Sequence, residues 1–145
     1  MIPLSISLLT QEYSSKKKEV VKMVYFVVGL GGTIGSIVRY FLDELISRTF
    51  LPPSSGILLV NLSGCFMIGF FLSLNSERFS PLVRIGFATG FIGSFTTFST
   101  FSVKVLELFK NWGLQTSAIY TLLTIIGGYC FVHLGHSLAA KIEKG

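Results

Sequence analysis

Four long stretches without an Asp, Glu, Lys or Arg constrain this chain more than any other feature. They cover residues 23–38, 57–76, 85–103 and 111–140. About 18 consecutive apolar residues are enough to span a bilayer, and each stretch is near or above that length. The last stretch is long enough to cross once with a tilt, but too short to cross twice with a turn. The sequence therefore predicts an all-α membrane protein with four transmembrane helices.

The overall composition agrees with this interpretation. Charged residues make up 13% of the 145 positions, whereas a soluble domain carries about 25%. Cys65 and Cys130 both lie inside apolar stretches and have neither the spacing of a metal site nor that of a disulfide framework. The basic residues behind the net charge of +5 are scattered over connections and termini. This distribution favours contact with lipid headgroups over binding of nucleic acid.

Residues 1–22 form a polar extension ahead of the transmembrane domain, which we assign to residues 23–145. Lys16, Lys17 and Lys18 precede an apolar segment that begins at Met23. No small-residue cleavage site follows before the next connection, so this segment predicts a retained helix and not a signal peptide. Two interpretations of the extension stay open. It is either a disordered cytoplasmic tail or the result of an upstream start codon wrongly assigned.

The distribution of basic residues bears on orientation in the membrane. The expected helices cover about residues 23–42, 57–74, 82–109 and 114–140. The N-terminus, the second connection and the C-terminus then share one side of the membrane, with four basic residues when counted from Met23: Arg78, Arg84, Lys141 and Lys144. The opposite side also carries four: Arg39, Arg48, Lys104 and Lys110. Because the two sides carry equal numbers of basic residues, the positive-inside rule predicts no preferred orientation. Such a chain could insert in both orientations.

The lysines of the extension would change this balance. If residues 1–22 are translated, Lys16, Lys17, Lys18 and Lys22 raise the first side to eight basic residues. The chain would then prefer both termini inside the cell. It would assemble with an oppositely inserted paralogue as a heterodimer, where the balanced chain would form an antiparallel homodimer.

The third stretch holds an unusual polar segment at residues 90–101. Five hydroxyl residues and two glycines fall within these twelve positions. Ser and Thr offer the backbone alternative hydrogen bonds, and Gly weakens the helix. We therefore expect the third helix to break near Gly93–Thr97, where freed carbonyls would suit a hard cation such as Na⁺. The alternative is a continuous helix whose hydroxyls bond back to the preceding turn.

Several side chains near this segment are candidates for an anion pathway. Phe98 and Phe101 lie three residues apart on one helical face, where the positive edges of their rings can attract an anion without trapping it. The alternative is that the two rings simply pack against lipid or neighbouring helices. Asn61 has an amide that would either replace part of an anion's hydration shell or clasp a neighbouring helix. Tyr120 and Thr124 lie four residues apart and line one polar face.

Two glycine pairs have the spacing of close helix packing in lipid. They are Gly31 with Gly35 and Gly86 with Gly90, each pair four residues apart. This spacing allows two backbones to approach closely. We expect helix contacts at both pairs, although glycine is also simply common in membrane helices.

Taken together, three motifs resemble the signature of the CrcB/Fluc fluoride-channel family. They are Gly31-Gly32-x-x-Gly35-x-x-x-Arg39-Tyr40, Asn61-x-x-Gly64-x-Phe66-x-x-Gly69, and Gly90-Phe91-x-Gly93-x-x-Thr96-Thr97-Phe98-Ser99-Thr100-Phe101. Their order and spacing cover nearly all of the chain after Met23, and the last motif is the most specific. Ser94 departs from the family, which often has a second glycine there. The N-terminal extension is a second departure.

The resemblance implies an architecture and a function. The family forms antiparallel, dual-topology dimers of four-helix subunits, with two fluoride pores and a central structural Na⁺ that is not transported. The carbonyls of Gly93 and Thr96 would hold that ion. The family's pore residues correspond to Asn61, Phe98, Ser99, Phe101, Tyr120 and Thr124, and Arg39 matches its first-helix arginine. The implied function is passive, fluoride-selective export through a bacterial plasma membrane.

The main alternative is a small proton-coupled multidrug exporter, which is also a four-helix, dual-topology dimer. Such a transporter needs a titratable carboxylate inside a span. All seven acidic residues instead fall in termini, connections or helix ends: Glu12, Glu19, Asp43, Glu44, Glu77, Glu107 and Glu143. A membrane enzyme would need a metal cluster, paired carboxylates or a nucleophile with a nearby base. The sequence shows none of these patterns, and we expect no enzymatic activity.

Overall fold

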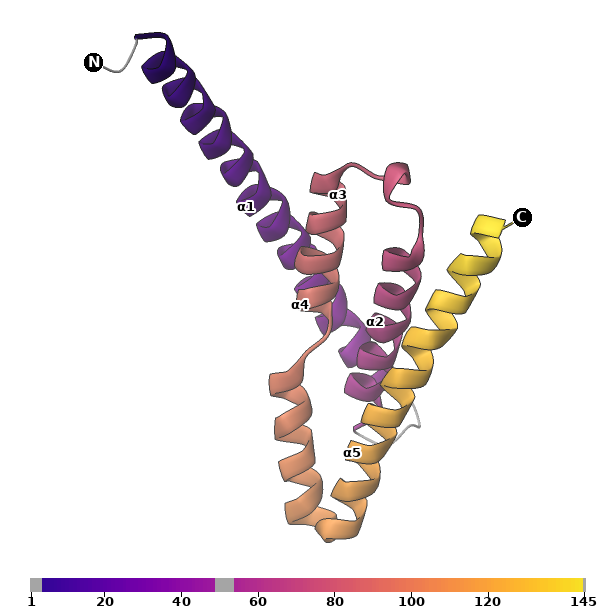
Figure 1. The fold of residues 1–145 in the computed structure, drawn as a ribbon. Helices are drawn as coiled ribbons and strands as arrows, with labels where there is room; N and C mark the ends of the chain where they lie inside the picture. Colours follow the sequence, from indigo (N-terminus) through magenta and orange to yellow (C-terminus); the bar gives the residue numbers. More distant parts are fainter. Residues whose placement is uncertain (1–3, 49–53, 145) are drawn as a thin grey trace.

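The computed structural model describes residues 4–48 and 54–144, and within these ranges every regular element is helical. The elements are α1 (Leu4–Ser47), α2 (Ser55–Ser73), the 3₁₀ turn η1 (Ser76–Arg78), α3 (Pro81–Ile85), the π-helical η2 (Gly86–Ile92), α4 (Gly93–Phe95) and α5 (Phe98–Lys144). Gly113 interrupts α5 with a φ of 81°, a left-handed conformation that glycine adopts without strain. The chain reverses direction there, so residues 98–112 and 114–144 form a hairpin (Figure 1).

Three helical ranges in the described part of the chain are long and apolar enough to cross a membrane. They are Gln11–Ile46, Ser55–Ser73 and Pro81–Lys144. The last range contains 64 residues and includes both the hairpin at Gly113 and the segment between α4 and α5. The prediction of an all-α membrane protein is therefore confirmed.

The first helix is longer than the sequence indicated, since it begins at Leu4 and not near Met23. Two charge pairs support the added turns: Lys16 lies 2.7 Å from Glu12, and Lys22 lies 2.9 Å from Glu19. Pairs at these spacings stabilise a helix by about 0.2–0.5 kcal/mol each. The 44 residues of α1 make a rod of about 66 Å, whereas the hydrocarbon layer is about 30 Å thick. Figure 1 shows the N-terminal part of this rod projecting beyond the other helices.

Close packing between α1 and η2 depends on the two predicted glycine pairs, and this expectation is confirmed. A Cβ atom on Gly31 would collide with the Gly86 carbonyl, and one on Gly35 would collide with the Phe91 carbonyl. A Cβ on Gly90 would in turn lie 2.7 Å from the carbonyl oxygen of Val28. The two backbones therefore touch, and any larger residue would force them apart.

A second close contact joins α2 to the C-terminal half of α5. A Cβ on Gly69 would overlap the Val132 carbonyl, and one on Gly135 would overlap the Phe66 carbonyl. The sequence did not reveal this pairing, because the two glycines are far apart and belong to different helices. This contact fixes how α2 packs against residues 114–144 of α5.

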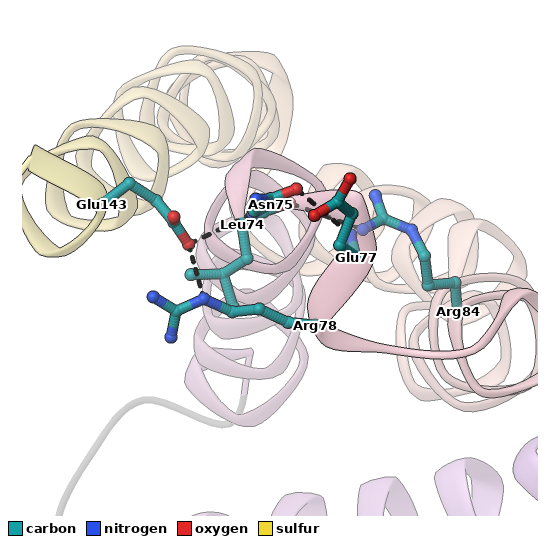
Figure 2. A network of polar contacts seen from close by, with 6 residues as sticks. All are labelled: Leu74, Asn75, Glu77, Arg78, Arg84 and Glu143. Carbon is teal, nitrogen blue, oxygen red and sulfur yellow. Dashed lines mark hydrogen bonds and ion pairs between the residues drawn. The ribbon is translucent and has the colours of Figure 1, made fainter.

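A polar network ties the end of α5 to the connection between α2 and α3 (Figure 2). The Glu143 carboxylate lies 2.9 Å from Arg78 Nε and accepts a hydrogen bond of 3.1 Å from the backbone N–H of Asn75. Arg84 donates to the Leu74 carbonyl at 3.4 Å, just past the end of α2. In Figure 1 this network and both termini lie toward one end of the molecule, opposite the hairpin at Gly113.

Candidate functional site

The helix leading into α4 stops at Phe95 and resumes at Phe98. Thr96 has φ −77° and ψ 151°, which is an extended and not a helical conformation. The restart has a local cause, because Thr97 Oγ1 accepts a 3.2 Å hydrogen bond from the backbone N–H of Thr100. This is the interaction of an N-cap residue with the third residue of its helix. Residues 96 and 97 thus separate two helical segments within an otherwise apolar range.

Asn61 on α2 satisfies the backbone of this interruption at two points. Its Nδ2 donates to the Thr97 carbonyl at 3.1 Å, and its Oδ1 accepts from the Thr97 N–H at 2.9 Å. The sequence left two roles open for Asn61, an anion ligand or a clasp to a neighbouring helix. The structure shows the clasp. It does not use the whole amide, since an amide nitrogen carries two hydrogens.

The same bonds alter the surroundings of the Gly93 and Thr96 carbonyls. In a continuous α-helix these oxygens would accept from the N–H groups of Thr97 and Thr100, four residues on. Here the Thr97 N–H is directed to Asn61, and the Thr100 N–H is directed to the Thr97 hydroxyl. Two carbonyl oxygens are thereby released from the helical pattern at the positions predicted to hold Na⁺.

Three aromatic rings follow one another beside the interruption. The centroids of Phe98 and Phe101 lie 5.8 Å apart, and Phe101 stacks on Tyr120 with the same separation. Phe98 is 81% exposed, whereas Tyr120 is only 7% exposed. The Tyr120 hydroxyl is buried, and within the described residues it has no hydrogen-bond partner. The structure therefore brings Phe98, Phe101 and Tyr120 together next to the Asn61–Thr97 clasp.

Within the described chain the other predicted site residues, Thr124, Ser99 and Arg39, form no hydrogen bond with the Asn61 amide. Thr124 lies one turn beyond Tyr120 and donates its hydroxyl proton to the Tyr120 carbonyl at 2.8 Å. Ser99 is exposed, with its hydroxyl 3.2 Å from Thr97 Oγ1. The Arg39 Nε is buried, and among the described residues nothing accepts its proton. No hydrogen bond of the described chain joins Arg39 to the aromatic rings.

A stripe that begins at Thr97, just before α5, and continues along α5 was not predicted from the sequence. Thr97 and three residues at the spacing of successive turns lie along one face: Phe101, Lys104 and Leu108. All four are half-buried, while Ser102 and Val103 between them are exposed. The spacing of these four residues is the signal that the sequence itself offers for this stripe.

A cavity lies at the end of this stripe. Its volume is about 210 Å³, and its lining includes Ser54 and Ser55 at the start of α2, Leu108, Thr116 and Tyr120. Hydroxyl groups and the first turn of α2 therefore face a common space near the end of the aromatic row. The Thr116 hydroxyl donates to the Trp112 carbonyl at 3.3 Å, and most of the surface that lines the cavity is apolar.

Comparison with known sequences decides the family. Residues 26–136 match the family described as CrcB-like protein, Camphor Resistance (CrcB). The chain belongs to the CrcB family. The match covers the glycine pairs, Asn61, the interruption and the aromatic row, so the resemblance seen in the three motifs is confirmed. It begins four residues after the polar extension ends.

Several relatives within the CrcB family carry a functional name. The chain is 38% identical over 123 residues to the fluoride-specific ion channel FluC 2 of Staphylococcus saprophyticus, with 83% of this chain and 100% of the relative covered. It is 41% identical over 118 residues to FluC of Azobacteroides pseudotrichonymphae, covering 78% and 93%. It is 40% identical over 132 residues to FluC 1 of Bacillus cereus, covering 88% and 90%.

These relatives also bear on class and location. Their names are those of ion channels and not of enzymes, in agreement with the expectation for this chain. They come from bacteria, and the described chain has three helical ranges able to span a membrane. The CrcB-family chain is accordingly a multi-pass bacterial membrane protein.

Proposed function

We propose that this protein is a fluoride-selective channel that passively exports fluoride from the cytoplasm. The observation that carries the proposal is the Asn61–Thr97 clasp, which holds interrupted backbone beside Phe98, Phe101 and Tyr120. Irregular backbone at membrane depth survives only where it is buried in protein or lines a wet cavity. The relatives named as fluoride channels support this choice of ion.

Fluoride selectivity in this proposal comes from replacing a tightly held hydration shell in a narrow pathway. The second N–H of the Asn61 amide and the buried Tyr120 hydroxyl supply neutral donors. The ring edges of Phe98 and Phe101 add weak positive potential. None of these groups carries a full charge, so the ion is stabilised without being trapped. Chloride is larger and would recover less of its solvation here.

The interruption also creates a helix N-terminus, whose dipole would stabilise an anion nearby. Residues 98–112 begin a helix whose positive dipole end lies at the clasp. A helix N-terminus carries about half a positive charge and stabilises a nearby anion. Discontinuous membrane helices place such ends near bound anions for this reason. Phe98 is the first residue of this helix, so the dipole end and the aromatic row coincide.

The working unit in this proposal is an antiparallel dimer of four-span subunits. Residues 81–112, with their interruption, make the third span, and residues 114–144 make the fourth. Phe98 is 81% exposed, so its own chain leaves most of that residue uncovered, and a second subunit would cover it. The partner is either another copy or an oppositely inserted paralogue, depending on how the extension biases insertion.

A structural Na⁺ fits the donor set at the interruption. Na⁺ is a hard cation that prefers oxygen ligands, and the Gly93 and Thr96 carbonyls are released from helical bonding there. These two oxygens, repeated in the second subunit, would hold the ion and lock the two interruptions together. Fluoride would pass without crossing this site.

The proton-coupled exporter is a poorer fit to the same geometry. Such an exporter requires a carboxylate that exchanges protons inside the span. In the described chain the side chains around Thr96 and Thr97 are amide, hydroxyl and aromatic groups. The acidic residues that form ion pairs lie outside this region, as Glu143 does with Arg78. The rival would therefore lack a coupling group at the interruption, since Asp43, whose charge acts on Tyr120, lies beside Gly56 at the start of α2.

Efflux from proteoliposomes tests the proposal directly. Vesicles that contain this chain alone are loaded with fluoride or with chloride, and release is followed with ion-selective electrodes. We expect rapid fluoride release and chloride release near that of empty vesicles. If the chain alone is silent, it is reconstituted with a second family member of opposite orientation. No fluoride release in either preparation overturns the channel function, and equal release of both halides overturns its selectivity.

A further inference from the structure

The stripe that carries Phe101 also carries a lysine, Lys104, that takes no part in the pathway proposed above. Lys104 lies between Phe101 and Leu108 on the buried face of residues 98–112. Its side chain is only 26% exposed. Phe101 stacks on Tyr120, and Leu108 lines the cavity that Tyr120 also lines. A cation is thus placed along the same face as the aromatic row, at its hairpin end.

The position of Lys104 along the helix is also informative. It follows Phe101 by three residues, which corresponds to about 4.5 Å along the axis. Its ammonium lies 2.9 Å from the Glu107 carboxylate, which is 51% exposed. Within this pair the lysine is the more covered partner and the glutamate is the more exposed one. A helix-stabilising pair needs neither this polarity nor a half-buried lysine.

We propose that Lys104 is an electrostatic collector that draws fluoride into the hairpin end of the pathway. The inference rests on the proposed channel function and concerns entry, whereas Asn61, Phe98 and Phe101 act on the dehydrated ion deeper inside. A charge at the mouth of a low-dielectric cleft raises the local concentration of counter-ions. Glu107 restrains the ammonium and weakens its field, so the pair holds the charge at the mouth without binding the anion tightly.

Salt dependence gives the effect a measurable signature. A unit charge about 4 Å from an ion in water changes the local ion concentration by about five-fold. The screening length is about 30 Å at 0.01 M salt and about 3 Å at 1 M. A collector therefore acts strongly in dilute salt and hardly at all in concentrated salt. A residue that matters only for packing shows no such dependence.

The experiment compares Lys104→Gln with Lys110→Gln in neutral phosphatidylcholine vesicles. Lys110 is on the same helix but exposed, and its replacement changes the net charge equally. Fluoride efflux is measured at about 0.01 M and about 1 M of an impermeant sodium salt. We expect Lys104→Gln to slow efflux about five-fold in dilute salt and to leave it near wild type in concentrated salt. Lys110→Gln should match wild type in both.

Two further variants guard against a folding artefact. Lys104→Arg keeps the charge and should retain the wild-type rate and salt dependence. Glu107→Gln leaves Lys104 in place and should raise efflux about two-fold in dilute salt. Equal behaviour of Lys104→Gln and Lys110→Gln overturns the inference, and so does a loss that is the same at both salt concentrations. A wild-type chain without fluoride efflux, alone or with its partner, refutes the channel function itself.

Discussion

Asn61 and Thr97 are joined by a reciprocal pair of hydrogen bonds between one side-chain amide and one peptide unit. The donor bond is 3.1 Å and the acceptor bond is 2.9 Å, across 36 residues of sequence. Each bond satisfies a backbone group that the interrupted helix leaves without its regular partner. A buried polar group without a partner costs about 1–3 kcal/mol of folding free energy. The clasp avoids this cost for both backbone groups of Thr97.

Replacing Asn61 with Ala should therefore destabilise the protein. The variant leaves both the N–H and the carbonyl of Thr97 unpaired, and we expect a loss of about 2–4 kcal/mol in the free energy of unfolding. Unfolding in detergent, followed by circular dichroism, measures this loss. Ser63→Ala is the control, because the Ser63 hydroxyl bonds only to the Val60 carbonyl of its own helix. Equal stability of the two variants would contradict the structural role of the clasp.

The aromatic row should determine flux more than stability. We expect Phe98→Ile or Phe101→Ile to reduce fluoride efflux about ten-fold, which corresponds to about 1.4 kcal/mol of lost stabilisation of the ion. Isoleucine keeps apolar volume but has no ring edge. Phe26→Ile is the control, since Phe26 is on α1 and 69% exposed. Unchanged efflux in both pore variants would remove the rings from the mechanism.

The glycine contacts offer a comparison within one helix. Gly35→Ala places a methyl group against the Phe91 carbonyl, whereas Gly29→Ala meets nothing within 4 Å. Overpacking costs about 1–3 kcal/mol, and alanine gains about 0.5–1 kcal/mol over glycine in a helix. We expect Gly35→Ala to lower the thermal midpoint in detergent and Gly29→Ala to keep or raise it. The reverse order would mean that α1 and η2 do not pack as described.

The lysines of the extension should decide orientation. A reporter fused to the C-terminus, active on only one side of the membrane, measures it. We expect the C-terminus inside for the native chain, and mixed orientation after Lys16, Lys17, Lys18 and Lys22 are all changed to Gln. Glu12→Gln with Glu19→Gln is the control, because acidic residues contribute little to orientation. Mixed orientation of the native chain would favour a homodimer.

Local pattern was enough to locate several of these features in the sequence. The uncharged stretches predicted helices that span a membrane, and the glycine spacing predicted the contact between α1 and η2. The polar residues of the segment 90–101 singled it out because such groups are costly inside lipid. In each case the information lies within one or two helical turns.

Other features depend on pairs that are distant in the chain. Spacing placed Asn61 inside a span but did not identify Thr97 as its partner. The contact of Gly69 with Val132 and the cavity near Tyr120 likewise arise only when helices pack. The first helix starts earlier than its polar sequence indicates, because charge pairs such as Glu12 with Lys16 stabilise helical turns. Tertiary packing, and not local propensity, decides these features.

Tyr120→Phe separates conduction from stability most cleanly. The Tyr120 hydroxyl is buried and has no partner within the described residues, so its removal should not lower the free energy of unfolding and should raise it by about 1 kcal/mol. The ring that stacks on Phe101 is retained. If the hydroxyl serves as a donor to fluoride, efflux should fall about ten-fold in the same variant, corresponding to about 1.4 kcal/mol. Thr121→Val is the matched control, because Thr121 is not among the predicted pore residues and its hydroxyl donates to the Ser117 carbonyl of its own helix at 2.8 Å. A stabilised Tyr120→Phe protein with native efflux would show that the hydroxyl takes no part in conduction.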